Sequence, residues 1–234
     1  MYELQTHQFT TPNGNPVVVN IRQNCNDWNT AFASLNEDEY GLRGMALSGL
    51  CLDVGGYLGT VALALALDFP DTRVIVVEPV PENLVLIRRN LIENDVEDRV
   101  TVVRGIAGPP GGGVIRYAFQ GGENELHHAF VGNAHWATGE TPHTALQVPS
   151  HSLSDLIGDE TVALLKIDCE GGEYAFLDDP AVAQVQRIVG EWHPNRPEGG
   201  SASREDITAL LGATHDVTFT GPEGGPGGFV AVRK

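Results

Sequence analysis

The chain has 234 residues, of which 41% are apolar and 19% are charged, so it can bury a full hydrophobic core, and wholesale disorder is excluded. Its 31 acidic and 14 basic side chains give a formal net charge of -17. This charge disfavours nucleic acids and anionic membranes as partners, because both would repel it.

Cysteine usage and the first residues indicate the compartment. Cys25, Cys51 and Cys169 lie far apart, without the paired spacing of a disulfide framework or a zinc site, which favours a reducing environment. The N-terminal residues lack the basic and apolar pattern of a signal peptide. The longest apolar run, Val61 to Leu67, is far below the ~18 residues of a membrane helix. We therefore expect a cytoplasmic protein.

The first 49 residues predict a hairpin followed by a lead-in. Asn13-Gly14 lies between extended segments within residues 8–21, and both residues tolerate the positive φ of a tight hairpin turn. Residues 26–49 read as irregular or helical.

From residue 50 the chain alternates short apolar runs with helical segments. The predicted strands are 50–52, 74–77, 100–103, 162–167 and 185–189, and the predicted helices are 60–67, 81–94, 153–157, a segment around 173–177, and one that begins near Ser203 and stops at Gly212. Residues 217–220 and 229–232 predict an antiparallel pair. Strands that alternate with helices predict a mainly parallel, seven-stranded α/β sheet covered on both faces.

Residues 108–150 interrupt this alternation. The segment has no clear helical period, although Val114 to Phe119 reads as a strand. It also contains His127, His128, His135, Trp136 and His143. Long excursions inside a compact domain are usually functional, so we expect this segment to be a lid that shapes the specificity for a substrate. The whole is predicted as one domain, with a hairpin and lead-in (1–49), a cofactor-binding half (50–107), the insertion (108–150) and the second half of the sheet (151–234).

A glycine-rich turn follows the first of these strands. It reads Asp53-Val54-Gly55-Gly56-Tyr57-Leu58-Gly59-Thr60. Gly55 and Gly56 let a ligand approach the backbone, and the N–H groups at the start of the next helix favour an anionic group. The dinucleotide motif G-x-G-x-x-G does not fit, because Val54 stands where its first glycine would be. The P-loop motif fails as well.

Glu78 ends the next strand, 23 residues after Gly55. A carboxylate at this point can accept hydrogen bonds from both hydroxyls of a ribose. Together with the closing antiparallel pair, these features predict a site for S-adenosylmethionine rather than for a redox cofactor. In this interpretation Tyr57 and Thr60 lie with the helix N-terminus near the methionine carboxylate, Asp53 lies near the ammonium group, and Ile106 flanks the adenine.

Four segments resemble the FkbM-type S-adenosylmethionine-dependent methyltransferases. They are the glycine turn, VEPVPENLVLIRRNL (77–91), SLSDL (152–156) and LLKIDCEGGE (164–173), and the resemblance covers roughly residues 37–195. It implies a Rossmann-like class I fold and methylation of hydroxyl groups on natural products or sugars. The chain departs from the family at Gly56-Tyr57, where Ala-Asn is common, and at Cys169, where an aliphatic residue is usual.

Three residues at the ends of the fourth and fifth strands are candidates for the chemistry. His193 is the preferred base, because its pKa range suits neutral pH. Glu191 lies two residues earlier on the same face of an extended strand and could orient the imidazole. Asp168 could contact the acceptor hydroxyl or the cofactor. Glu170 and Glu173 are expected to cap the turn.

The sequence leaves several points open. Asp168, Glu191 and His193 are also metal-ligand types, so a divalent cation stays an option that we do not favour. The acceptor is expected to be a small-molecule hydroxyl, with N-methylation of a small molecule as the alternative. A nicotinamide-type oxidoreductase and a non-catalytic binding module are two further interpretations of the same fold, and a homodimer is left open.

Overall fold

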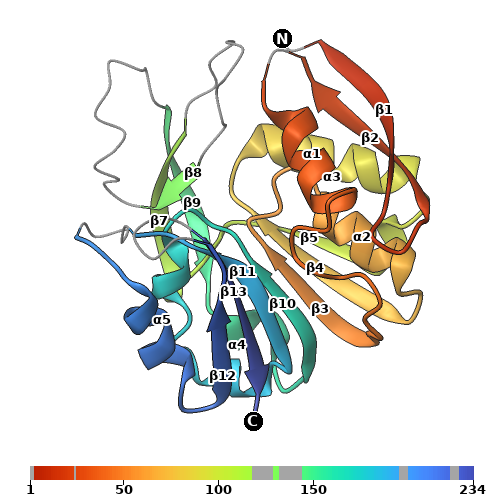
Figure 1. Ribbon diagram of the computed structural model, residues 1–234. Coiled ribbons are helices and arrows are strands. Elements are labelled where there is room, and N and C mark those ends of the chain that lie inside the picture. Colours follow the sequence, from red (N-terminus) through yellow and green to blue (C-terminus); the bar gives the residue numbers. More distant parts are fainter. Residues whose placement is uncertain (1–2, 24, 118–128, 132–143, 195–199, 222–226) are drawn as a thin grey trace.

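A seven-stranded sheet organises the molecule in the computed structural model, which describes residues 3–23, 25–117, 129–131, 144–194, 200–221 and 227–234 (Figure 1). The strand order is β12-β13-β11-β10-β3-β4-β5. The strands are β3 (Gly49–Val54), β4 (Thr72–Glu78), β5 (Val100–Arg104), β10 (Val162–Ile167), β11 (Arg187–Trp192), β12 (His215–Phe219) and β13 (Gly227–Arg233). From β11 to β5 the neighbours are parallel, and β13 is antiparallel to both β11 and β12. This confirms the predicted class I α/β sheet with its C-terminal antiparallel pair.

Both faces of this sheet are covered, as the continuous apolar runs predict. Successive residues of β3 point to opposite faces, so Cys51 packs with the helices of one core, whereas Leu50 and Leu52 pack with the other. The first core includes α1 (Asp27–Leu35), α2 (Thr60–Asp68) and α3 (Pro81–Glu93). The second includes α4 (Leu153–Ile157) and α5 (Arg204–Leu211).

The N-terminal hairpin is present as β1 (Leu4–Thr10) and β2 (Pro16–Arg22), which pair antiparallel from Leu4 opposite Arg22 to Thr10 opposite Pro16. Its loop is longer than the tight turn we expected. Only Gly14 has a positive φ, of 96°, and the carboxylate of Asp68 in α2 accepts a hydrogen bond from the backbone N–H of Asn13 at 3.0 Å. Contacts with α2 therefore shape the loop. The helical part of the lead-in is α1.

The described part of residues 108–150 forms a second sheet, with no helix. Strands β6 (Ile106–Ala107), β7 (Gly111–Tyr117), β8 (Ala129–Val131) and β9 (Thr144–His151) are ordered β6-β9-β7-β8. The predicted strand lies within β7 as far as Tyr117, and residues 118 and 119 lie outside the described residues, as do all five histidine and tryptophan residues singled out in the insertion. The second sheet begins with β6 directly after β5; β6 pairs parallel with β9, and β7 pairs antiparallel with β8 and β9.

Two predicted elements of the second half differ in the structure. Residues 172–175 form a short 3₁₀ turn, η2 (Gly172–Ala175), instead of a helix over 173–177, and Glu170 and Gly171 before it adopt left-handed conformations with φ of 55° and 96°. Strand β11 runs on to Trp192, so it contains Glu191. Two further 3₁₀ turns are η1 (Glu97–Arg99) and η3 (Pro180–Gln184). Within the described residues, every helix is too short or too polar to cross a lipid bilayer.

Candidate active site

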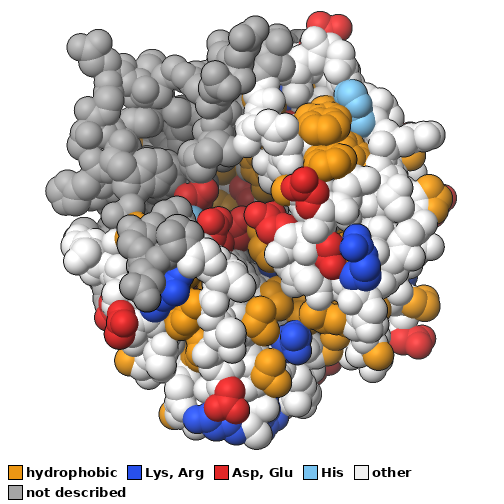
Figure 2. All heavy atoms as spheres, viewed as in Figure 1, with side chains coloured by type: hydrophobic (Ala, Val, Ile, Leu, Met, Phe, Trp, Pro, Cys, Tyr) orange, Lys and Arg blue, Asp and Glu red, His pale blue; other side chains and the backbone are white. Residues whose placement is uncertain are grey.

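A cavity of about 370 Å³ opens at the carboxyl ends of β3, β4, β10 and β11, where open α/β sheets bind their ligands. Its wall combines the glycine turn after β3, the end of β4, the start of β6, residues after β10, Glu191 of β11 and one face of α1. Figure 2 shows acidic side chains gathered at a hollow on this face of the molecule. Four lining residues are acidic and come from outside the glycine turn and β4: Glu39, Asp168, Glu170 and Glu191.

The glycine turn packs closely against the loop after β10. Gly55 has a φ of 82°, and a Cβ placed on it would lie 1.7 Å from the backbone oxygen of Asp168. A Cβ on Gly56 would lie 2.2 Å from Cγ2 of Val76. Neither site can hold a side chain without displacing its neighbour, so glycine at these positions lets the turn pack against β4 and the loop after β10.

Gly59 and Thr60 begin α2. Gly59 is its N-terminal cap residue, in the left-handed region with a φ of 79°. It is not among the residues that line the cavity, and a Cβ on it would lie 3.3 Å from Ile87 of α3. Thr60 lines the cavity, and its hydroxyl oxygen accepts a hydrogen bond from Ser34 of α1 at 2.8 Å.

The carboxylate of Glu78 turns toward the glycine turn and lines the cavity. Its Oε2 accepts a hydrogen bond from the backbone N–H of Tyr57 at 2.8 Å, and Oε1 accepts from the N–H of Val80 at 2.9 Å and from Nδ2 of Asn83 at 3.1 Å. The side chain is nearly buried, and burial raises its pKa to about 7, against the effect of these hydrogen bonds. A carboxylate has about four acceptor positions, so one position on Oε2 is left for a ligand hydroxyl, rather than the two that we expected for a ribose.

Tyr57 occupies the family's usual asparagine position in a left-handed conformation, with a φ of 48°. Tyrosine rarely adopts this conformation, whereas asparagine does so more readily. Its hydroxyl donates a hydrogen bond to Oδ1 of Asp27 at 2.5 Å, and the guanidinium of Arg22 lies 5.3 Å from its ring centre. Tyr57 thus connects the glycine turn to the N-terminal segment, a contact that no sequence pattern predicts.

Asp53 and Ile106 lie at different depths. Asp53 is fully buried and is absent from the cavity wall, because it forms an ion pair with Lys166 at 3.1 Å. Lys166 reaches the wall in its place and donates a hydrogen bond to the carbonyl of Gly55 at 2.6 Å. Ile106 does line the cavity, and Gly113 of β7 leaves room for it, since a Cβ there would lie 2.4 Å from Cδ1 of Ile106.

Asp168 lies at the end of β10 and lines the cavity, as predicted. Its Oδ2 accepts a hydrogen bond from the hydroxyl of Tyr40 at 2.9 Å. Burial and the charge of Asp168 raise the pKa of Tyr40 well above its usual value, so Tyr40 is a donor at all physiological pH values. Glu39 and Tyr40 therefore bring the lead-in segment to the cavity wall beside Asp168.

His193 sits among three carboxylates. Its backbone N–H donates to Oε1 of Glu173 at 2.7 Å, and its Nδ1 lies 3.2 Å from the same oxygen. Its Nε2 lies 3.4 Å from Glu170 and 3.8 Å from Glu191. Burial lowers the pKa of His193, but the hydrogen bond and charge of Glu173 with the charges of Glu170 and Asp168 raise it to about 9.

This environment changes the role that His193 can play. Near neutral pH the imidazole carries a proton, whereas the expected base would need to be neutral. Glu191 differs, because burial and the charge of Asp168 raise its pKa to about 7 even though His193 opposes the shift. Glu191 and His193 therefore lie close together, as we expected. Their pKa values, however, favour the carboxylate of Glu191 as the proton acceptor, with the protonated imidazole of His193 beside it. Glu173, which is fully buried, also accepts from the N–H of Gly171 at 3.0 Å, in line with its predicted capping role.

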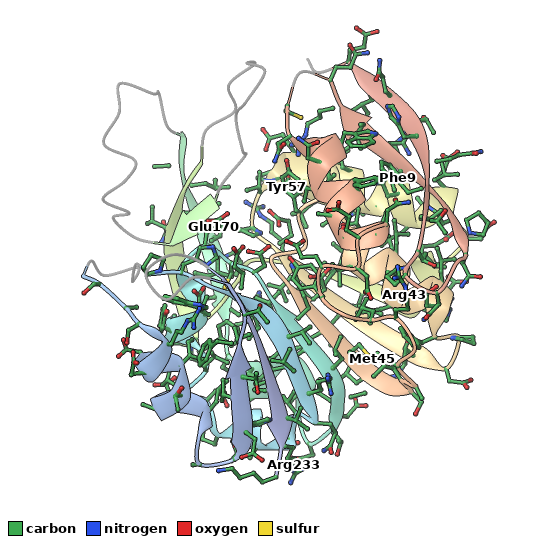
Figure 3. The ribbon with its side chains drawn as sticks, in the orientation of Figure 1. Phe9, Arg43, Met45, Tyr57, Glu170 and Arg233 are labelled. Carbon is green, nitrogen blue, oxygen red and sulfur yellow. The ribbon has the colours of Figure 1, made fainter. Side chains whose placement is uncertain are left out.

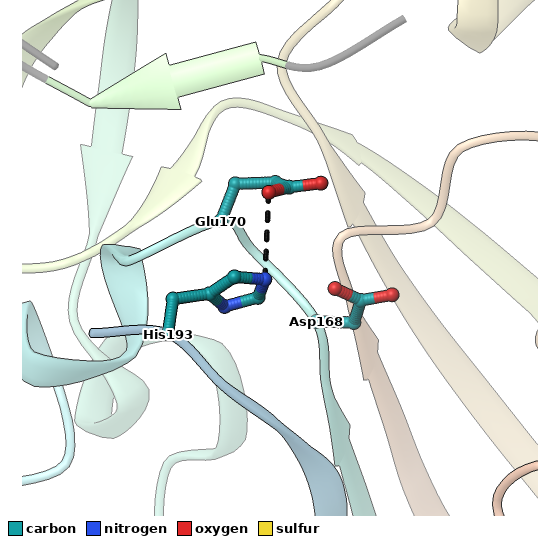
Figure 4. A group of neighbouring side chains, drawn as sticks. All are labelled: Asp168, Glu170 and His193. Carbon is teal, nitrogen blue, oxygen red and sulfur yellow. Dashed lines mark ion pairs between the residues drawn. The ribbon is translucent and has the colours of Figure 1, made fainter. Parts of the chain in front are cut away.

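The same region holds residue types that bind divalent cations. One atom each of Asp168, Glu170 and His193 lie within 4.8 Å of one another (Figure 4). This group contains two of the three residues that we considered for a cation, with Glu170 in place of Glu191. In the structure the imidazole is already within ion-pair distance of Glu170, so a cation would have to compete with its proton.

Several lining residues were not predicted. Asn26, Asn29, Thr30, Ala33 and Ser34 of the α1 region come from a part of the chain without a recognisable motif, whereas Asn83 belongs to α3. Figure 3 labels Tyr57 and Glu170, two lining residues supplied by the glycine turn and by the loop after β10. Asn83 and Lys166 did carry a signal, since they lie inside the segments VEPVPENLVLIRRNL and LLKIDCEGGE.

A parallel sheet with a glycine turn and a strand-end glutamate, and without a dinucleotide motif, defines a Rossmann-like class I methyltransferase. The model of the methyltransferase FkbM domain matches residues 53–219, and the chain therefore belongs to this family of S-adenosylmethionine-dependent methyltransferases. The open turn, the cavity and the free acceptor position of Glu78 fit that cofactor. Family membership sets aside the oxidoreductase interpretation.

Solved structures agree with this fold. The methyltransferase FkbM from Methylobacillus flagellatus is 17% identical with a TM-score of 0.52, over 82% of this chain and 45% of that one. A putative O-methyltransferase from Nostoc punctiforme is 10% identical with a TM-score of 0.52, over 88% of this chain and 58% of that one. The match thus spans about half the length of these relatives. Comparison with curated proteins gives no match.

Proposed function

We propose that the protein methylates a hydroxyl group of a small molecule, with Glu191 as the proton acceptor. The observation that carries this proposal is the pairing of Glu191, which lines the cavity, with His193, which is not among the lining residues: a carboxylate with a pKa of about 7 lies 3.8 Å from an imidazole with a pKa of about 9. A base whose pKa lies near the working pH combines a large ionised fraction with an effective drive for proton transfer.

Binding and orientation are assigned to the two sides of the cavity. The free position on Oε2 of Glu78 accepts a ribose hydroxyl of the cofactor. The turn at Gly55 and Gly56 leaves space for the methionine end of the cofactor, and Ile106 flanks its adenine. S-adenosylmethionine, when bound, supplies an activated methyl group. Glu191 would accept the hydrogen bond of the acceptor hydroxyl and take up its proton as the oxygen bonds to the methyl carbon and the carbon–sulfur bond breaks, leaving S-adenosylhomocysteine. Asp168, bonded to Tyr40, lines the cavity beside it.

A second candidate, N-methylation, is favoured by the acidity of the same wall. Four carboxylates line the acceptor side, and they would attract a cationic amine. An amine also needs a base, since its ammonium form has no lone pair to react. Glu191 would have the same part in both reactions, so the acceptor atom distinguishes them.

The test is a screen of small hydroxylated and aminated acceptors with S-adenosylmethionine, with S-adenosylhomocysteine release as the readout. We expect hydroxyl acceptors to give product, and mass spectrometry of the product locates the methyl group. Turnover only on amines would replace the proposal with N-methylation. Cofactor binding by calorimetry without turnover on any acceptor would support a non-catalytic binding module.

A further inference from the structure

A closed ring of buried polar groups joins the N-terminal segment to Glu78. Arg22 forms a two-pronged ion pair with Asp27, through Nε to Oδ2 at 2.8 Å and Nη2 to Oδ1 at 2.9 Å. Its third nitrogen, Nη1, donates to Oδ1 of Asn83 at 2.9 Å. Asn83 then donates to Glu78, and Tyr57 closes the ring with its N–H on Glu78 and its hydroxyl on Asp27.

The members of this ring are hardly exposed. The relative exposure is 2% for Arg22, 0% for Asp27, 2% for Asn83 and 3% for Glu78. Ion pairs in such surroundings contribute little net stability compared with apolar packing, because both partners lose their hydration. Their geometry is nevertheless strongly fixed, since a buried donor or acceptor left without a partner costs about 1–3 kcal/mol. The ring is therefore better suited to setting orientation than to adding stability.

Arg22 determines which way the amide of Asn83 faces. A guanidinium has donors only, so the group that faces Nη1 must be the amide oxygen of Asn83. The amide nitrogen then faces Glu78, where it donates to Oε1. Were the amide reversed, its oxygen would meet a carboxylate oxygen, and the contact would be tolerated only if Glu78 carried a proton.

Other charged groups around Glu78 act in the same direction or are already paired. Lys166 of β10 favours the ionised carboxylate through its charge, although it is paired with Asp53. Asp27 of α1 is held by Arg22; burial alone would raise the pKa of Asp27, but the hydrogen bonds and charge of Arg22 keep it below its usual value. Tyr57 faces Glu78 with its backbone N–H. The orientation of Asn83 is thus the contribution that the N-terminal segment makes to Glu78.

We infer that Arg22 is a positioning residue for the cofactor: by fixing the amide of Asn83 as a donor, it keeps Glu78 an ionised acceptor for the ribose hydroxyl. Asp27 has the supporting part of holding the guanidinium. This inference rests on the ribose contact of Glu78 proposed above. It gives the N-terminal hairpin a role in cofactor binding.

The test measures binding of S-adenosylhomocysteine by calorimetry between pH 6 and 9, which requires no acceptor. For the native chain we expect affinity to rise with pH through a midpoint of about 7, as Glu78 loses its proton. In Arg22→Met and in Asn83→Ala the midpoint moves up by about one unit, so affinity falls roughly fivefold at pH 7 and stays within about twofold at pH 9. Circular dichroism checks that each variant is folded. If Arg22→Met does not fold, the midpoint of Asn83→Ala alone tests the inference.

Asn90→Ala is the matched control. Asn90 is also a fully buried asparagine of α3 that bonds to β2, through Oδ1 and the N–H of Asn20 at 2.7 Å, but it does not contact Glu78. It should lose stability and keep the midpoint of the native chain. A native midpoint in both test variants, or an equal loss of affinity at every pH, overturns the inference. No binding by the native chain at any pH would instead refute the ribose contact of Glu78 itself.

Discussion

Glu78 and Glu191 both have a pKa near 7, yet they stand in opposite surroundings. Glu78 is nearly buried and is held by three donors, so burial is almost the only effect that opposes its ionisation. The side chain of Glu191 is 38% exposed, and the charged groups around it are several other carboxylates and the imidazole of His193. The cofactor side is therefore fixed before any ligand arrives, whereas the acceptor side has excess negative charge that a bound molecule can use.

Removal of the carboxylate on the acceptor side should have the largest effect. Glu191→Gln loses the proton acceptor, so we expect turnover to fall by roughly 10²–10⁴-fold while the affinity for S-adenosylhomocysteine changes little. The measurement is initial rate with the best acceptor from the screen. Glu39→Gln is the matched variant, because Glu39 lines the same wall from the lead-in segment, and its effect should be much smaller. Comparable losses in both would show that overall negative charge, and no single base, supports the reaction.

The cluster around His193, beside Glu191, should also make the stability of the protein depend on pH. The pKa of His193 is raised from 6.5 to about 9, so its contribution to folding is complete below about pH 6.5 and is lost as pH rises through about 9. The full difference corresponds to an upper limit of about 3 kcal/mol. Urea denaturation at pH 6.5 and 9.5 measures it. In His193→Gln this decrease should disappear; if it persists, other groups are responsible.

A smaller effect is expected where the ring meets the glycine turn. Tyr57→Phe removes one hydrogen bond to Asp27, whose two oxygens keep their bonds from Arg22. We expect a loss of about 1 kcal/mol in the free energy of unfolding and little change in cofactor affinity, because the N–H that binds Glu78 is retained. Urea denaturation and calorimetry test the two parts. A large loss of affinity would mean that the ring acts through Tyr57 rather than through Asn83.

The smallest effect should come from a chelator. Since His193 is protonated near neutral pH and faces Glu170, we expect EDTA to leave turnover unchanged and added Mg²⁺ to give no increase. Loss of turnover with EDTA and its return with Mg²⁺ would assign a divalent cation to the acceptor side.

Sequence predicted the sheet well, because each of its strands is a compact apolar or β-branched run next to a helix that carries its own signals. Strand ends placed Glu78, Asp168 and Glu191 at one cavity for the same reason. The roles of His193 and Asp53 could not be foreseen, since they depend on which charges lie beside them. The contact between Arg22 and Asn83 joins residues 61 positions apart, and Arg22 lies outside every segment that resembles the family.

The ring of buried polar groups also matters for the design of truncated fragments and chimeras of this protein. The family match begins at Asp53, whereas Arg22 and Asp27 precede it. A fragment or chimera designed from the matched segment would keep every recognisable motif and still lose Arg22, the donor that orients Asn83, and Asp27, which holds Arg22 in place. Enzyme engineers who exchange acceptor specificity between relatives should therefore transplant the hairpin and α1 together with the core they stabilise.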